Sequence, residues 1–401
     1  MHPKDLSIHD YTYVLPEERI ARHPLAQRDE SRLLHYRAGH IADKVFQELP
    51  ELIPANALLV LNDTRVVRAR IQMQRATGAV LEYMVMDPAE SRTMEVALLD
   101  KRTSRWWCMV GNAKRWKGEE LVLEQDGITL RAERIEQRNG EHLIEFRWND
   151  DRAFVDVLQC TGSVPLPPYM RREAMPDDDT RYNTVFATNN GSIAAPTASL
   201  HFSEEVLARL KERGVRSTHL TLHVGAGTFL PVKSERMAEH DMHSEQVRIP
   251  REALIALREQ VDRGPIIAVG TTALRSLESI YWHGVMLLQR RAKGALRIEQ
   301  WEPYDHTNEE LPSTAEALDA VIGSLGEATS VLSGNTSLLI APGYDFRFAT
   351  GLITNFHQPQ STLLLLVAAF VGPDWRRIYD HALGNDYRFL SYGDGSLLMR
   401  G

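Results

Sequence analysis

The sequence has little of what secreted or membrane proteins usually contain. Its 401 residues include two cysteines, Cys108 and Cys160, too few for a disulfide framework or a cysteine-rich zinc site. The longest apolar run, Leu363–Val371, is far shorter than the roughly 20 residues that span a bilayer. The first ten residues lack the apolar segment of a secretory signal. We therefore expect a cytoplasmic protein that does not contact a membrane.

A strong positive charge is also absent. The chain has 46 Lys and Arg residues against 54 Asp and Glu residues, a net charge of −8. This balance excludes a protein that coats nucleic acid nonspecifically over its whole surface. Residues 62–150 hold 15 basic and 15 acidic side chains, so this segment has no net charge and the whole net charge of −8 comes from the rest of the chain. One local basic patch remains compatible with the composition.

The hydrophobic pattern changes character along the chain. Residues 58–61 form a continuous apolar run that ends in Asn62-Asp63, as a buried parallel strand does. Short alternating runs punctuated by glycine then predict strands at 80–86, 94–99, 120–124, 128–132 and 142–146. Further on, the pattern predicts strands at 219–224, 265–270 and 338–341, and helices at 204–213, 250–262, 273–281 and 363–371.

Alternation of strand and helix is typical of an α/β fold, whereas many short strands with glycine turns are typical of a small β-barrel. We therefore predict a larger, discontinuous α/β domain, residues 1–64 and 152–401. A small β-barrel domain, residues 65–151, is expected to be inserted into it.

Three predicted strands are followed by loops suited to a small ligand: residues 224–229, 269–275 and 340–346. Open α/β sheets bind ligands at the carboxyl ends of their strands, so we expect these loops to cluster. Each loop alone is equally typical of an ordinary strand-to-helix turn. A dinucleotide fingerprint is excluded because its third glycine position is Leu230, and the sequence contains no Walker A loop or H-E-x-x-H motif.

Histidine is concentrated between residues 201 and 245. His219 and His223 share one face of a predicted strand, because side chains alternate along a strand. The cluster, with His240 and His243, is compatible with a metal site or with a hydrogen-bonded polar pocket. Glu245 beside His243 forms either an acid–base pair or a surface salt bridge.

Other polar segments lie where a ligand could bind. Asn62 and Asp63 follow the buried strand, and Asn355 and His357 precede the apolar helix, where free N–H groups point. The loop at residues 191–201 is made of small side chains, which either leave room for a ligand or pack closely.

Seven ordered segments together carry a family resemblance: Leu61–Val66, Pro165–Tyr169, Ala194–Phe202, Thr221–Phe229, Met242–Glu245, Val269–Glu278 and Ile353–His357. From about Asp10 to Leu398 the chain resembles the S-adenosylmethionine:tRNA ribosyltransferase-isomerases of queuosine biosynthesis. The resemblance implies an α/β fold with an inserted barrel. It also implies that S-adenosylmethionine, used as a substrate, donates its ribosyl carbons to a 7-deazaguanine base in tRNA. No metal or further cofactor is implied, and we expect a monomer.

Such a reaction needs a base for the hydrogens beside the sulfonium, a donor for the departing adenine and an acceptor for a proton of the attacking amine. His and Glu are the usual groups for these steps. The resulting catalytic candidates are His201, His223, His243, Glu245 and His357. The substrate-binding candidates are Asn62, Asp63, Thr64, Arg65, Tyr169, Tyr182, Thr197, Phe202, Gly225, Gly227, Thr228, Phe229, Thr271, Thr272, Arg275, Glu278, Gly343, Phe346 and Asn355. Their aromatic members either stack on a base or pack in the core.

A stretch without acidic residues carries the candidates for tRNA contact: Lys101, Arg102, Arg105, Lys114, Arg115 and Lys117. Trp106, Trp107 and Trp116 are interleaved with them. Cations for phosphates and aromatic rings for stacking are what RNA contact requires. A solvated hairpin with its tryptophans in the barrel core is the other interpretation. Two other functions also remain open, a metal-dependent hydrolase built on the histidine cluster and a noncatalytic RNA-binding protein.

Overall fold

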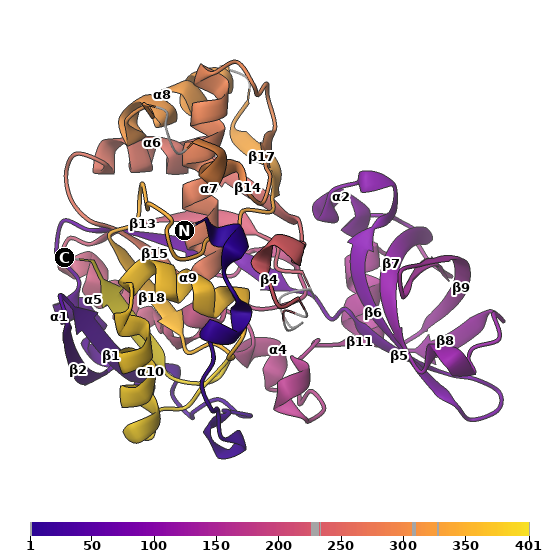
Figure 1. Cartoon of the computed structure of the whole chain (residues 1–401). Coiled ribbons are helices and arrows are strands. Elements are labelled where there is room, and N and C mark those ends of the chain that lie inside the picture. Colours follow the sequence, from indigo (N-terminus) through magenta and orange to yellow (C-terminus); the bar gives the residue numbers. More distant parts are fainter. Residues whose placement is uncertain (1, 226–231, 233, 307–309, 327–328, 401) are drawn as a thin grey trace.

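Two large sheets organise the chain. In this computed structural model the described residues are 2–225, 232, 234–306, 310–326 and 329–400. A ten-stranded sheet lies in the larger part of the molecule, and a seven-stranded sheet stands beside it (Figure 1). A short two-stranded sheet, β4 (Thr64–Val66) with β12 (Asn189–Ser192), lies near their junction.

The ten-stranded sheet is mixed. Its order is β16 (Leu296–Ile298), β17 (Val331–Thr336), β14 (Glu245–Pro250), β13 (Arg216–Leu222), β3 (Leu58–Asn62), β15 (Ile266–Val269), β18 (Gly351–Asn355), β19 (Gly395–Met399), β1 (Arg32–Arg37) and β2 (His40–Val45). β3 pairs in parallel with β13 on one side and with β15 on the other. The carboxyl ends of these three strands therefore lie at one edge of the sheet.

Helices cover both faces of this sheet. They are α1 (Leu49–Leu52), α5 (Glu204–Glu212), α6 (Arg251–Gln260), α7 (Thr271–Leu288), α8 (Thr314–Ser324), α9 (Thr362–Val371) and α10 (Asp374–Gly384). Alternate residues of β3 point to opposite faces. Leu58 and Val60 pack in a cluster with residues of α6 to α10, and Leu59 and Leu61 pack in another with α1 and α5. Burial on both sides explains the continuous apolar run of β3.

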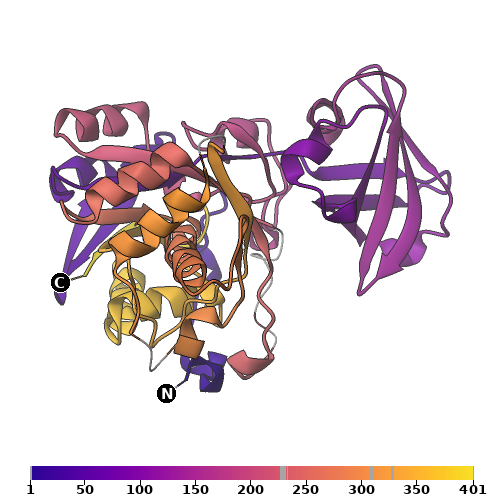
Figure 2. The same cartoon turned by 90° about the horizontal axis from the view of Figure 1, so that it is seen from above.

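The seven-stranded sheet is antiparallel throughout. Its order is β11 (Gly162–Ser163), β5 (Arg70–Gln74), β6 (Val80–Pro88), β7 (Thr103–Gly111), β10 (Glu141–Trp148), β9 (Ile128–Arg138) and β8 (Leu121–Gln125). The sheet is curled (Figure 2), and it encloses its own core, which includes Tyr83, Trp106 and Phe146. The helices α2 (Met94–Leu98) and α3 (Phe154–Thr161) pack on that core. We call residues 67–163 the curled-sheet part.

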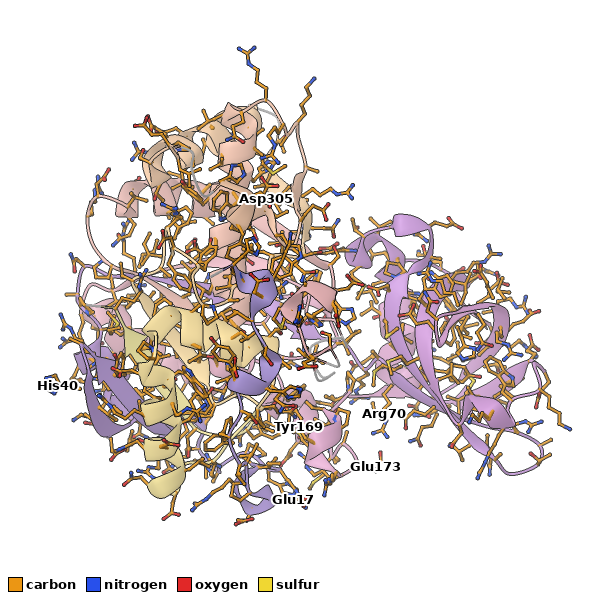
Figure 3. The ribbon with its side chains drawn as sticks, in the orientation of Figure 1. Glu17, His40, Arg70, Tyr169, Glu173 and Asp305 are labelled. Atoms are coloured by element: carbon orange, nitrogen blue, oxygen red, sulfur yellow. The ribbon has the colours of Figure 1, made fainter. Side chains whose placement is uncertain are left out.

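Ion pairs join the two parts. Arg70 of β5 lies 2.9 Å from Glu173, which precedes the short helix α4 (Asp178–Arg181) (Figure 3). Arg68 pairs with Asp179 of α4. In the same view Tyr169 lies in the larger part, close to this junction. No helix within the described ranges is long and apolar enough to cross a membrane.

Most of the predicted elements are confirmed. The apolar helix is α9, whose N-cap Ser361 accepts a hydrogen bond from the N–H of Leu364. The strand predicted at 94–99 is wrong, because α2 occupies this segment and buries Met94, Ala97 and Leu98 at helical spacing. The strand predicted at 338–341 is also wrong. These residues are buried but lie outside any strand, and β17 precedes them, because an apolar run reports burial rather than strand pairing.

The close packing of α7 on α8 generates a stability prediction. A Cβ atom at Gly284 of α7 would lie 2.3 Å from the carbonyl oxygen of Ala317, whereas a Cβ atom at Gly323 of α8 would meet nothing within 4 Å. We expect Gly284→Ala to lower the free energy of unfolding by about 1–3 kcal/mol. Gly323→Ala should raise it by about 0.5–1 kcal/mol through backbone entropy. Denaturant unfolding of both variants checks this, and equal effects would contradict the close contact.

Candidate active site

One buried amide holds together the edge where β3, β13 and α7 meet. Asn62, at the end of β3, is fully buried. Its Nδ2 donates to the carbonyl of Leu222 at 2.9 Å and to Oγ1 of Thr272 at 3.3 Å. Its Oδ1 accepts from the N–H groups of Leu222 at 3.0 Å and of Thr64 at 3.2 Å. The sequence predicts that Asn62 binds substrate, but in the structure both polar atoms of its side chain form hydrogen bonds within the protein.

A pocket opens on one side of this amide, and we call it the inner pocket. It brings together several of the predicted segments: Tyr169, Tyr182, residues 194–198, Val224, residues 270–272, residues 354–358, Ser361, Leu363, Leu390 and Ser391. The space within it measures about 790 Å³, including the part open to solvent. Thr197, Thr271, Thr272, Asn355 and His357 lie here, so these predicted residues converge.

The N-terminus of α7 points into the inner pocket. The preceding residue, Gly270, has a φ of 92°, which favours glycine, and none of the side chains that the structure describes caps the helix. The first N–H groups of a helix have no partner within it, and the helix dipole favours negative charge there. Thr271 and Thr272 therefore present a site suited to a carboxylate or another small anion.

Asn355 and His201 meet beneath the same pocket. Asn355 Nδ2 lies 3.1 Å from Nε2 of His201, so this ring nitrogen is the acceptor and the imidazole is neutral. Burial lowers the pKa of His201 to about 4. Asn355 Oδ1 is buried and has no hydrogen-bond partner among the described residues. It is an acceptor left open beside the pocket.

His357 and Tyr169 contribute further polar atoms to the inner pocket. His357 Nε2 lies 2.9 Å from Oγ1 of Thr354, and burial lowers the pKa of His357 to about 3. The hydroxyl of Tyr169 lies 2.5 Å from Oγ of Ser391, and burial raises the pKa of Tyr169 to about 12. Near neutral pH, His201, His357 and Tyr169 are therefore all uncharged.

A second pocket, the outer pocket, lies between the curled-sheet part and the rest of the chain. From the curled-sheet part it is lined by residues 86–88, Glu90, Arg92, Met94, Trp107, Met109, Arg138 and Glu141. From the remainder it is lined by Gly191, Ile193, residues 223–225, residues 243–246 and Asn335. Val224 lines both pockets, so the two spaces adjoin there. Among the predicted residues, His223, Gly225, His243 and Glu245 lie in the outer pocket.

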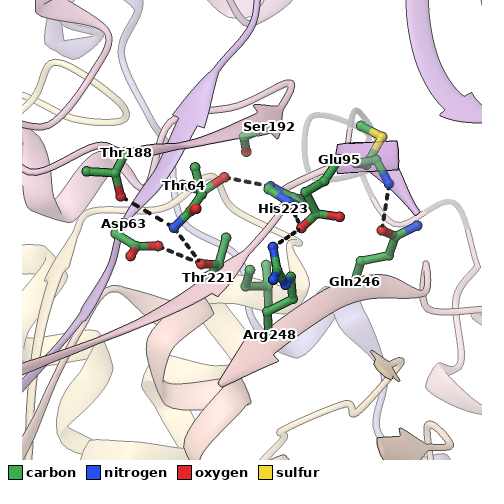
Figure 4. A network of polar contacts seen from close by, with 12 residues as sticks. Asp63, Thr64, Glu95, Thr188, Ser192, Thr221, His223, Gln246 and Arg248 are labelled. Atoms are coloured by element: carbon green, nitrogen blue, oxygen red, sulfur yellow. Dashed lines mark hydrogen bonds and ion pairs between the residues drawn. The ribbon is translucent and has the colours of Figure 1, made fainter. Parts of the chain in front are cut away.

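His223 sits in a polar network that crosses the two parts (Figure 4). Its Nδ1 lies 2.8 Å from Oγ1 of Thr64, and its Nε2 lies 3.2 Å from Oε1 of Glu95 on α2. Arg248 of β14 donates to the same Glu95 oxygen at 3.0 Å. Burial alone would raise the pKa of Glu95, but hydrogen bonds from His223 and Arg248 lower it to about 2. Glu95 is therefore an anion at neutral pH.

The sequence interpretation missed Glu95 and Arg248. The sequence pattern predicts a strand at 94–99. The apolar residues at positions 94, 97 and 98 have helical spacing, and this spacing is the signal for a helix with Glu95 on its other face. Nothing in the local sequence of Arg248 distinguishes it from a solvated arginine.

Glu245 and Arg275 form a buried ion pair. Arg275 Nη1 of α7 lies 2.6 Å from Oε2 of Glu245, and both side chains are almost fully buried. His243, two residues before Glu245, is exposed at the rim of the outer pocket. The structure thus gives Glu245 an ionic partner on α7 and leaves the His243 ring accessible to solvent.

Several substrate-binding candidates lie outside both pockets. Glu278 is buried and accepts hydrogen bonds from the Tyr344 hydroxyl and from the N–H groups of Arg347 and Phe348. It therefore stabilises the loop at residues 344–348. Phe346 packs on Phe370, and Gly343 lies in the turn before this loop, with a φ of 99°.

The remaining candidates outside the pockets lie nearer β3. Phe202 is fully buried against Phe46, where core packing accounts for it. Asp63 accepts from the Thr221 hydroxyl, and Arg65 is exposed on β4. Gly227, Thr228 and Phe229 lie outside the described residues.

The six tRNA-contact candidates are all exposed on β7 and the segments that flank it. Arg102 pairs with Asp151 at 2.6 Å and Arg105 pairs with Glu145 at 2.7 Å, which reduces their free charge. Trp106 and Trp116 are buried in the core of the curled sheet, as the hairpin interpretation expected. All six residues stay predicted tRNA contacts, and Arg102 and Arg105 are the two that also form these ion pairs.

Two members of the histidine cluster, His219 and His223, have different surroundings. His219 packs on Phe186, with ring centres 5.6 Å apart, whereas His223 bonds to Thr64 and Glu95. Within the described residues, no group of three or more His, Cys, Asp or Glu side chains is placed to hold a metal ion. The alternative of a metal-dependent hydrolase built on this cluster therefore has no support.

Residues 8–398 match the family model described as queuosine biosynthesis protein. A curated relative from Azoarcus sp. (strain BH72), named S-adenosylmethionine:tRNA ribosyltransferase-isomerase, is 40% identical over 402 residues, covering 98% of each chain. A relative of the same name from Ruegeria pomeroyi is 39% identical and covers 99% of this chain and 100% of its own. A solved S-adenosylmethionine tRNA ribosyltransferase from Thermotoga maritima is 28% identical, with a TM-score of 0.46, covering 97% of this chain and 100% of its own.

The buried histidines predict how stability depends on pH. The pKa of His201 is about 4 in the folded protein, against an ordinary value of 6.5. As the pH falls, the unfolded chain therefore takes up this proton at a higher pH than the folded protein does. The stability that His201 contributes is complete above pH 6.5 and is lost as the pH falls towards 4, by about 3 kcal/mol at most. In His201→Gln the loss of stability between pH 6.5 and 4 should be smaller.

Urea unfolding of the wild type and of His201→Gln across this pH range checks the prediction. The exposed His40→Gln serves as the matched control, and it should keep the wild-type dependence. A His201→Gln variant with the full wild-type loss would show that this ring is not held neutral by burial.

Proposed function

The chain belongs to the queuosine biosynthesis protein family, and we propose that it acts as an S-adenosylmethionine:tRNA ribosyltransferase-isomerase through the two adjoining pockets. This enzyme transfers and isomerises the ribosyl moiety of S-adenosylmethionine onto the 7-aminomethyl-7-deazaguanine base at the tRNA wobble position. The products are epoxyqueuosine-tRNA, adenine and methionine. The observation that carries this function is the near-full-length identity of 39–40% to relatives of that name.

We assign S-adenosylmethionine to the inner pocket. Its methionyl carboxylate suits the free N–H groups at the start of α7, beside Thr271 and Thr272. The open acceptor Asn355 Oδ1 suits an amino group of the same molecule. Because His357 in the pocket and His201 beneath it are neutral, the sulfonium charge meets no buried cation from either ring.

We assign the modified tRNA base to the outer pocket. Its aminomethyl group then approaches the ribose where Val224 separates the two spaces. The proton-transfer candidates divide accordingly. The ring of His357 holds a proton only weakly because burial lowers its pKa to about 3, so it serves as a hydrogen-bond acceptor. His243, which is exposed, can take a proton and pass it to water.

The curled-sheet part serves in this proposal as an inserted small β-barrel domain. The sequence predicts its bounds as 65–151, and the packing of α3 and β11 with it supports an end near residue 163. Its exposed cations Lys101, Lys114, Arg115 and Lys117 are suited to tRNA phosphates. A cytoplasmic location, a monomeric state and independence from metal ions stay predictions.

The function predicts a product that can be counted. Purified protein incubated with S-adenosylmethionine and tRNA that carries the 7-aminomethyl-7-deazaguanine base should release one adenine for each epoxyqueuosine formed. Chromatography of the free bases and of the digested tRNA measures both products. Unmodified tRNA is the control and should give no adenine. Retained tRNA binding without turnover would instead favour a noncatalytic RNA-binding protein, and activity that needs stoichiometric zinc would favour a hydrolase.

A role of His243 in proton transfer predicts a particular kinetic split. His243→Ala should lower kcat by about 100-fold, the lower range for loss of a general acid or base. The dissociation constant of the tRNA complex should change by less than about 3-fold, because an exposed rim residue contributes little to a large interface. Single-turnover kinetics and filter binding give the two numbers, and the exposed His40→Ala is the control. Equal losses in rate and binding would assign His243 a structural role.

A further inference from the structure

A carboxylate from the curled-sheet part contacts a histidine of the other part, and that histidine lines the outer pocket. Glu95 lies on α2, and His223 follows β13, 128 positions further along the chain. The His223 ring is almost fully buried, yet it lines the outer pocket. The two residues meet only because α2 lies against β14.

Three contacts fix the His223 ring. An ionised carboxylate can only accept hydrogen bonds, so Nε2 of His223, which contacts Glu95, carries a proton. In the neutral ring Nδ1 is then the acceptor, and the Thr64 hydroxyl donates to it at 2.8 Å. Gly191 leaves the space for the ring, since a Cβ atom there would lie 2.7 Å from Cε1 of His223. Orientation and tautomer are thus both determined by neighbours.

Thr64 does not act as a nucleophile in this arrangement. Although Thr64, His223 and Glu95 follow the order of a hydroxyl–histidine–carboxylate triad, Thr64 is completely buried. It lines neither the inner nor the outer pocket. A substrate therefore has no access to its hydroxyl, which serves to orient the ring.

Two further contacts keep α2 in place. Arg248 Nη1 donates to the same oxygen of Glu95 at 3.0 Å, which neutralises part of its charge. The N–H of Met94 donates to Oε1 of Gln246 at 3.1 Å. Both partners lie on β14, the strand that also carries Glu245, so Glu95 reaches His223 only while the curled-sheet part is docked on β14.

We propose that Glu95 is a positioning residue that orients His223 in the outer pocket, so that the curled-sheet part completes the catalytic site of the larger part. This inference rests on the proposed function, and it adds a role for the curled-sheet part beyond contact with tRNA. The charged groups at this ring are Glu95 itself and Arg248, which Glu95 holds. A carboxylate that accepts a hydrogen bond from one ring nitrogen of a functional histidine commonly fixes the tautomer of that ring.

A double-mutant cycle tests the inference. Glu95→Gln keeps the shape of the side chain and removes its charge, and we expect kcat to fall by at least 10-fold while KM for S-adenosylmethionine changes by less than about 2-fold. His223→Gln should lower kcat by at least as much. If Glu95 acts through His223, the double variant is no slower than His223→Gln alone, because the two residues form one unit.

The controls separate positioning from docking. Glu124→Gln, an exposed residue on β8 of the same curled sheet, should leave kcat unchanged. Glu95→Asp retains the charge and should recover part of the lost rate. If the effects of Glu95→Gln and His223→Gln multiply, Glu95 acts independently of His223 and the inference is overturned, as it is if Glu95→Gln turns over at the wild-type rate.

A second measurement does not depend on turnover. In protein with nitrogen-15-labelled histidine, the ring signals of His223 are identified as those missing from His223→Gln. In the wild type they should show a proton on Nε2, and Glu95→Gln should shift them while Glu124→Gln should not. Unchanged His223 signals in Glu95→Gln would overturn the inference even in an active enzyme. Wild-type protein that releases no adenine would instead count against the proposed function, while these signals still test the contact.

Discussion

The site depends on one buried hydrogen-bonding group, the side-chain amide of Asn62. It bonds to both backbone groups of Leu222, to the N–H of Thr64 and to the hydroxyl of Thr272. A buried polar backbone group that loses its partner costs about 1–3 kcal/mol, so the bonds of this amide favour the observed arrangement of the three chain segments. The inner pocket depends on this amide through the start of α7, and the outer pocket depends on it through Thr64 and the His223 ring. A residue that lines neither pocket therefore supports both of them.

The two pockets differ in their electrostatics in a way that suits two different substrates. His357 in the inner pocket and His201 beneath it are neutral, because burial lowers the pKa of both rings far below neutrality. A molecule with a fixed sulfonium charge fits there without repulsion from these rings. The outer pocket is lined by charged side chains of both signs, among them the exposed Glu90 and Arg138. Exposed charges of both signs are compatible with a polyanion that must bind and leave at each turnover.

Some of this arrangement follows from sequence patterns and some does not. β3 is predictable because residues 58–61 are apolar on both faces, and α9 is predictable because Ser361 caps a long apolar run. The convergence of Thr271 with Val224 follows from parallel pairing of β15 and β13 with β3. The α2–β14 contact could not be predicted, since the five residues of α2 also alternate as a strand would and their partner lies about 150 residues away. The place of Phe202 could not be predicted either, because an aromatic residue beside a ligand-binding loop can equally well pack in the hydrophobic core.

The proposed function places S-adenosylmethionine in the inner pocket with its carboxylate at the start of α7. A crystal structure of the enzyme with bound S-adenosylmethionine tests this most directly. We expect electron density for the methionyl carboxylate within hydrogen-bonding distance of the Thr271 and Thr272 N–H groups, with the ribose beside Val224. Density for the ligand in the outer pocket alone, or with its carboxylate directed away from α7, would contradict it.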